Sequence, residues 1–273
     1  MRLIGVDFTS APRRAKPITV ANGVLDDSGL ALRGLESCTS WREFEALLTR
    51  PGPWLGGFDF PFGLPREAVL DLGWPTEWPA LVRHCAALGR ERFRAALDAY
   101  RQTRPSGARY AHRATDRPAR SHSPLKLVNP PVGLMFLEGA PRLLDAGLCL
   151  PGLHAGPNVD GMRVAVEAYP GLLARTITPA SYKSDDRRKH TAGRRAARVD
   201  IVTALETGNH PLGIALRVDS EQRIALCEDA GGDRLDAVLA LVQAAWCVRF
   251  GPPRYGMPEG SDPLEGWIAT AGS

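Results

Sequence analysis

Acidic residues at the ends of apolar segments are the part of this sequence that could do chemistry. Asp7 follows the apolar run LIGV, Asp59 lies within GGFDFPFG, Glu167 closes RVAVE, and Asp233 and Asp236 are spaced i and i+3 at the start of an apolar stretch. Carboxylates that gather in a protein raise one another's pKa unless a cation lies among them. Because no His or Cys pairs at metal-ligand spacing accompany them, we expect Mg²⁺ or Mn²⁺ rather than zinc.

Each of these acids also has a purely structural interpretation. Asp7 could accept hydrogen bonds from the backbone of Thr9 or Ser10 in the following turn. Asp233 could complement the dipole of a helix N-terminus, and Glu167 could hold a loop. The hypothesis of a joint site therefore depends on whether the fold brings the acids together.

Strand and helix patterns indicate how the acids are positioned. Alternation and turn residues predict strands at 2–9, 17–25 and 29–36 as an antiparallel meander, then a helix near 41–49 capped by Ser40, and a fourth strand from Trp54 reached by a parallel crossover. Residues 163–171 predict another strand, and helices are expected at 80–102, 133–147, 191–207 and 232–249. Asp7 and Asp59 then lie near the carboxyl ends of strands, as does Glu167.

The composition is that of a soluble protein with material for one large domain or two small ones. The chain has 273 residues, 44% hydrophobic and 23% charged. No apolar run is long enough to span a membrane, and the five scattered cysteines predict free thiols, so we expect a cytoplasmic protein. Residues 65–160, in which helical pieces alternate with Pro, Gly, Ser and Arg, are expected to be an insertion or cap within a single domain 1–273.

Basic residues gather in two clusters despite a net charge of only +4. One cluster lies between Arg101 and Lys126 and the other between Lys183 and Arg198. Such clusters favour an anionic partner such as nucleic acid, although solvated loops and helix faces have the same composition.

Six segments together resemble the domain of unknown function 429 family, described as predicted nucleases with an RNase H-like fold. They are IGVDFTSAP, GGFDFPFGLP, VEAYPGLL, KHTAGRRAARV, DRLDAVLALVQAAW and EGWIA, in the order of the family and across almost the whole chain, with the middle insertion matched least. The resemblance implies an α/β fold with a mixed five-stranded sheet, three antiparallel strands followed by two parallel ones, flanked by helices.

The resemblance also implies a nuclease that hydrolyses phosphodiester bonds with two metal ions. By position it assigns metal binding to Asp7, Asp59 and Asp236, with Asp233 as the near alternative, while Glu167 matches an E-x-Y-P motif of the family. The expected catalytic residues are thus Asp7, Asp59, Glu167 and Asp236. Nucleic-acid phosphates would be contacted by Lys126, Lys183, Lys189 and Arg194. His190 is a candidate proton shuttle, and Trp74, Trp78 and Tyr110 could stack bases or pack in the core.

Two other functions remain open at this stage. GVDFTS weakly resembles the phosphate turn of actin-like kinases and ATPases, but Phe8 stands where those proteins have a glycine. A nucleic-acid or nucleotide-binding protein that kept the fold and the acids without turnover is the third alternative. Loss of metal-dependent cleavage in Asp7→Asn would distinguish an enzyme from such a binder.

Overall fold

The computed structural model describes residues 1–156 and 162–272, and it is an α/β protein. Its strands are β1 (Arg2–Asp7), β2 (Ile18–Asp26), β3 (Gly29–Cys38), β4 (Trp54–Phe58), β5 (Arg163–Glu167) and β6 (Leu216–Arg217). Its helices are α1 (Trp41–Leu48), α2 (Arg66–Asp71), α3 (Trp78–Thr103), α4 (Asp116–Ala119), α5 (Val132–Asp145), α6 (Pro170–Ile177), the 3₁₀ turn η1 (Arg187–Lys189), α7 (Ala192–Thr207), α8 (Ser220–Glu228) and α9 (Asp233–Val248). None of the described helices is both long and apolar enough to cross a membrane.

The strands form one mixed sheet in the order β5-β4-β1-β2-β3-β6. β1, β2 and β3 are the predicted antiparallel meander, and β4 and β5 continue from β1 in parallel, also as predicted. The expected number of five strands is wrong, because the two-residue strand β6 pairs in parallel with the outer edge of β3. Its two residues show no alternation from which a strand could be predicted.

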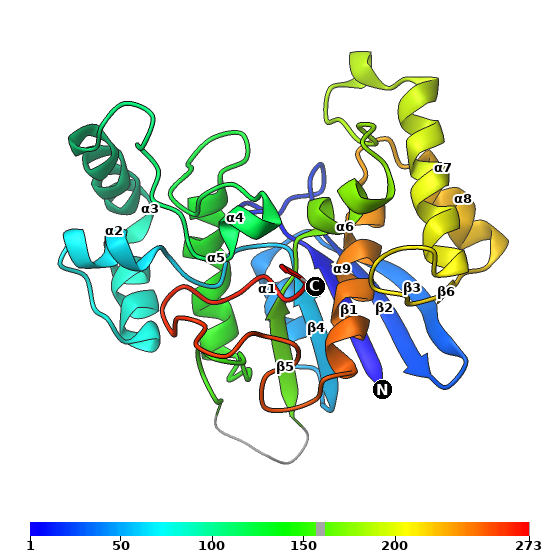
Figure 1. Ribbon diagram of the computed structural model, residues 1–273, viewed down its shortest axis with the longest axis horizontal. Helices are drawn as coiled ribbons and strands as arrows, with labels where there is room; N and C mark the ends of the chain where they lie inside the picture. The colour runs from blue at the N-terminus through cyan, green and yellow to red at the C-terminus, as the bar shows by residue number, and fades with distance from the viewer. Residues whose placement is uncertain (157–161, 273) are drawn as a thin grey trace.

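Helices cover both faces of the sheet, and each face has its own hydrophobic core. One core holds Ile4, Val6 and Phe58 with α1, α3 and α5, and the other holds Leu3 and Leu55 with α6 to α9. In Figure 1, α2 and α3 lie at one end of the molecule and α7 and α8 at the other, with the sheet between them. Alternate residues of β1 and β4 therefore serve different cores, as the period of two in a strand requires.

Two glycines let helix α9 lie directly on the sheet. A Cβ at Gly5 would come 2.0 Å from the Ala237 carbonyl oxygen, and one at Gly57 would come 2.5 Å from that of Ala240. Only glycine permits such a close approach of helix backbone to strand backbone. This contact sets the height of α9 above the ends of β1 and β4.

The expected insertion is helical, as predicted, but its helices share the core of the sheet. α3 turns sharply at Gly89, whose φ of 70° breaks the helix, and Phe93 and Phe136 of α3 and α5 belong to the same core as Ile4 and Val6. Residues 157–160, at the far end of the expected insertion, lie outside the described residues.

Candidate active site

The register of two parallel strands places Asp7 and Asp59 together. Gly5 of β1 pairs with Gly57 of β4, and the Asp59 backbone N–H donates to the Val6 carbonyl oxygen at 2.9 Å, so the ladder continues to the strand ends. Two residues beyond the paired glycines, both carboxylates lie on the face that α9 covers. The sequence prediction that these two acids meet is therefore supported by the structure.

Helix α9 brings the next two carboxylates to the same place. Gly232 precedes the helix with φ of 80°, and the Asp229 carboxylate accepts from the Arg234 backbone N–H at 2.9 Å. Asp233 and Asp236 follow one helical turn apart, and Asp236 is 0% exposed. Because α9 packs on β1 and β4, its first turn lies over the ends of those strands.

Each helix aspartate already has a lysine. The Lys183 ammonium donates to Asp236 Oδ2, and the Tyr182 hydroxyl donates to Asp236 Oδ1 at 2.5 Å. The Lys16 ammonium donates to both oxygens of Asp233, at 2.7 and 3.0 Å. Both oxygens of each helix aspartate are therefore bonded within the protein.

The carboxylates of Asp7 and Asp59, in contrast, form no hydrogen bond or ion pair with any residue in the described part of the chain, and the backbone of Thr9 and Ser10 does not cap Asp7. Burial and the neighbouring Asp236 raise the pKa of Asp7 well above its usual range, although Lys183 partly offsets this. Burial and Asp236 also raise the pKa of Asp59 to about 7. The raised pKa values mean that both ionised carboxylates lack sufficient positive charge nearby.

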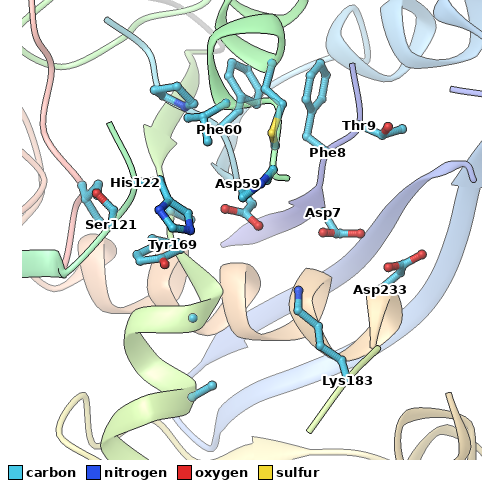
Figure 2. A pocket seen from close by; sticks show the side chains of 18 of the residues that line it. Asp7, Phe8, Thr9, Asp59, Phe60, Ser121, His122, Tyr169, Lys183 and Asp233 are labelled. Carbon is cyan, nitrogen blue, oxygen red and sulfur yellow. The ribbon is translucent and has the colours of Figure 1, made fainter. Parts of the chain in front are cut away.

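These carboxylates line a cavity of about 730 Å³. Figure 2 shows Asp59, Asp7 and Asp233 along one wall, with the Lys183 side chain pointing towards Asp7 and Asp59. Ser121, His122 and Tyr169 lie across the cavity from Asp7 and Asp233. An apolar wall is supplied by Phe8, Phe60, Pro130, Val132 and Met135. The cavity thus combines an acidic wall, an apolar surface and a polar wall with an imidazole.

Glu167 points to the opposite face of the sheet. Glu167 of β5 pairs with Phe58 of β4, and paired residues lie on the same face of a sheet. Asp59 is the next residue after Phe58, so its side chain lies on the other face. Its carboxylate accepts two hydrogen bonds from Arg113, at 2.6 and 2.7 Å, and one from the Phe62 backbone N–H at 3.0 Å. Arg113, 2% exposed, also bonds Asp116 at 3.0 and 3.2 Å, so Glu167 belongs to a closed ion network at the edge of the cavity.

The predicted phosphate-contacting residues are divided by the fold. Lys183 lines the cavity, and Lys126 lies behind its polar wall, with Nζ 3.4 Å from His122 Nε2. Arg194 instead donates to the Lys183 carbonyl oxygen, and Lys189 is exposed on η1 outside the cavity lining. His190 is also outside it, with its ring nitrogen 2.8 Å from the Ser184 carbonyl oxygen.

The aromatic residues considered for base stacking belong to the body of the protein. Trp74 packs on Phe93, and Trp78 donates from its indole nitrogen to the Phe62 carbonyl oxygen at 2.7 Å. Tyr110 accepts from Arg101 at 2.6 Å and does not line the cavity. The alternative that Trp74 and Trp78 are core residues is the one that the structure supports.

Sequence reasoning missed four residues of this region, which are Lys16, Tyr182, Arg113 and the cavity residue His122. Lys16 lies 217 residues from its partner Asp233, and no local pattern relates them. Tyr182 directly precedes Lys183, whose cluster had been noted for charge alone. Arg113 was one of several arginines in the first basic cluster, and only its burial distinguishes it from the others.

A divalent cation at this site would need several oxygen ligands from the cavity. Within residues 1–156 and 162–272, no three His, Cys, Asp or Glu side chains are arranged so that they could hold a metal ion. Asp7 and Asp59 nevertheless offer carboxylate oxygens that no described residue binds, and carboxylate oxygens are the ligands that Mg²⁺ and Mn²⁺ prefer. Two carboxylates are fewer ligands than a divalent cation takes, so a cation here would need water or substrate for its other ligands.

Comparison with known proteins adds no assignment. No family model matches the chain, and no curated protein and no solved structure matches it.

Proposed function

We propose that this protein is a nuclease that hydrolyses phosphodiester bonds of nucleic acid with Mg²⁺ or Mn²⁺ bound at Asp7 and Asp59. The observation that carries the proposal is a pair of carboxylates at adjacent strand ends that have no partner in the described part of the chain and face a cavity of about 730 Å³. The antiparallel meander followed by two parallel strands supports an RNase H-like identity for the sheet, which is part of this proposal.

The charge balance of the acidic wall supports a cation. Among the described residues, two of the four carboxylates in this wall have a lysine partner, Asp233 with Lys16 and Asp236 with Lys183, and Asp7 and Asp59 have none. Two negative charges are left without a counter-ion, and both are on the carboxylates that face the cavity. Burying such charges without compensation costs several kcal/mol, so a divalent cation would stabilise the ionised site.

A cation bound there supplies a Lewis acid that activates water and stabilises a leaving oxygen. Asp7 and Asp59 hold it on the α9 face of the sheet, where the glycine contacts of α9 fix the depth of the site. Lys183 lines the cavity, and Lys126 lies 3.4 Å from the cavity residue His122, so both provide positive charge for a phosphate group. His122, whose pKa is lowered by burial and by Lys126, is neutral at pH 7 and can accept a proton.

Cleavage assays test this function directly. Single- and double-stranded DNA and RNA are incubated with the protein in Mg²⁺, in Mn²⁺ and in EDTA. We expect cleavage of at least one substrate in a divalent cation, none in EDTA, and a loss of more than about 100-fold in Asp7→Asn and in Asp59→Asn. Asp26→Asn, which removes a carboxylate paired with Arg217 at the far end of β2, is the matched control and retains activity.

Two outcomes would replace the proposal with the alternatives considered from the sequence. Hydrolysis of ATP without cleavage of any nucleic acid would favour a nucleotide phosphotransferase or ATPase. Cation-independent binding of nucleic acid without cleavage, unchanged in Asp7→Asn, would favour a non-catalytic binding protein.

A further inference from the structure

Hydrogen bonds to the backbone of residues 182–184 hold the segment that carries Lys183 in place. The Ser184 N–H donates to the Ala230 carbonyl oxygen at 3.1 Å, and buried Arg198 donates to the Tyr182 carbonyl oxygen at 2.7 Å. Arg194 binds the carbonyl oxygen of Lys183 itself. Hydrogen bonds on both sides thus fix the point from which the side chain of Lys183 starts.

The stem of Lys183 then passes directly over the start of α9. A Cβ added to Gly232 would come 2.6 Å from Lys183 Cβ and 3.0 Å from its Cδ. The bare glycine leaves room for this stem, which leads the ammonium to Asp236. The side chain is 44% exposed, yet its charged end is bonded to a carboxylate that is 0% exposed.

Asp236 is consequently closed to any other cation while Lys183 is bonded to it. One oxygen accepts from Tyr182 and the other from Lys183, and no part of Asp236 is exposed. Asp233 is held in the same way by Lys16. A site that binds two divalent cations needs a third carboxylate beyond Asp7 and Asp59. Asp185, which also lines the cavity, is paired with Lys16 at 3.2 Å, so each of the other aspartates described here has a lysine partner.

We propose that Lys183 is a built-in counter-ion that limits the site to one divalent cation, and that a second cation binds only when the lysine leaves Asp236. This inference rests on the proposed function, since it presumes a cation at Asp7 and Asp59. A phosphate group of the substrate offers Lys183 another partner in the same cavity. Substrate binding would thereby free Asp236 and couple entry of the second cation to the presence of substrate.

The number of Mn²⁺ ions bound per chain tests the inference without measuring activity. Free Mn²⁺ is measured by electron paramagnetic resonance after equilibrium dialysis against the intact protein. We expect one bound ion in the native chain, two in Lys183→Met, and one in Lys183→Met combined with Asp236→Asn. Arg188→Met, which removes a positive charge from the same loop at a side chain 90% exposed, is the matched control and binds one.

Lys183→Gln removes the charge on a shorter side chain that still carries N–H donors, and it replaces Lys183→Met if circular dichroism shows that the methionine variant is unfolded. It too is expected to bind two ions. Two ions in the native chain, or one ion in the folded Lys183 variants, would overturn the inference and leave the proposed function intact. No bound ion in the native chain would overturn the proposed function itself.

Discussion

Two groups of carboxylates lie at the ends of neighbouring parallel strands, and they differ in how their charge is compensated. Glu167 at the end of β5 shares Arg113 with Asp116, and its oxygens are bonded by the guanidinium and by a backbone N–H. The carboxylates of Asp7 and Asp59, at the ends of β1 and β4, face the cavity with no partner among residues 1–156 and 162–272. The comparison indicates that the first group holds the chain together and that the second is available to a ligand.

Arg113 accounts for the difference in charge compensation between the two groups of carboxylates. Its planar guanidinium offers five N–H donors, enough to satisfy two carboxylates at once, whereas a lysine ammonium offers three donors on one atom. Arg113 also donates to the Glu265 carbonyl oxygen at 2.9 Å, and so joins the loop before α4 to the C-terminal segment. The Ala269 N–H in that segment donates to the Glu167 carbonyl oxygen at 2.9 Å.

Removal of the arginine should have the largest effect on stability. Arg113→Met leaves Glu167 and Asp116 buried and unpaired, so we expect the free energy of unfolding to fall by about 3–5 kcal/mol. Urea denaturation at pH 7 measures this change in the free energy of unfolding. Arg188→Met serves as the control, with a change within about 0.5 kcal/mol. A loss in Arg113→Met as small as that of the control would remove the basis for calling the first group structural.

Neutralising Asp59 should have the opposite effect and raise the free energy of unfolding. The folded-state pKa of Asp59 is raised from 3.8 to about 7, so the native protein loses stability as the pH rises through that window. In EDTA at pH 8, Asp59→Asn should therefore be more stable than the native chain, with a free energy of unfolding that is larger by up to about 4 kcal/mol. Near pH 3.5, where Asp59 is largely protonated in both the folded and the unfolded chain, this difference in the free energy of unfolding should almost vanish. Urea denaturation at the two pH values checks this, and destabilisation at pH 8 would contradict the account.

The two groups also show how far the sequence could predict the site. Alternation in LIGVDF and in GGFDF is local, and it correctly predicted strands with Asp7 and Asp59 near their carboxyl ends. The face of Glu167 depends on the register between β4 and β5, and a shift of one residue reverses the face of every side chain. No pattern within one strand contains that information.

The lysine partners could not be predicted for a related reason. Lys16 reaches Asp233, and Lys183 reaches Asp236, only because α9 packs over β1 and the loop before η1 passes over its first turn. The helix boundaries were easier, since Ser40 accepts from the Glu43 N–H at 3.3 Å as its sequence position predicts. Contacts within a few residues were thus predictable, and contacts across the chain were not.

Removal of Lys126, a partly exposed cation beside the same cavity, should have the smallest effect. Lys126 has no carboxylate within ion-pair distance among the described residues, so it is free to contact substrate phosphate. Lys126→Met should weaken substrate binding by roughly 1 kcal/mol at low salt and less at high salt, because added ions screen exposed charges. Fluorescence anisotropy with a labelled oligonucleotide in Ca²⁺ measures this. A loss independent of salt would mean that Lys126 acts through packing instead.

Calorimetric titration of Mn²⁺ into the native chain, Asp7→Asn, Asp59→Asn and Glu167→Gln tests the central claim most directly, because it compares the two groups of carboxylates in one experiment. The account predicts that the native chain and Glu167→Gln bind the ion, and that Asp7→Asn and Asp59→Asn each lose at least about tenfold in affinity. A native chain that binds no Mn²⁺, or that binds it equally well without Asp7 and Asp59, would contradict the account.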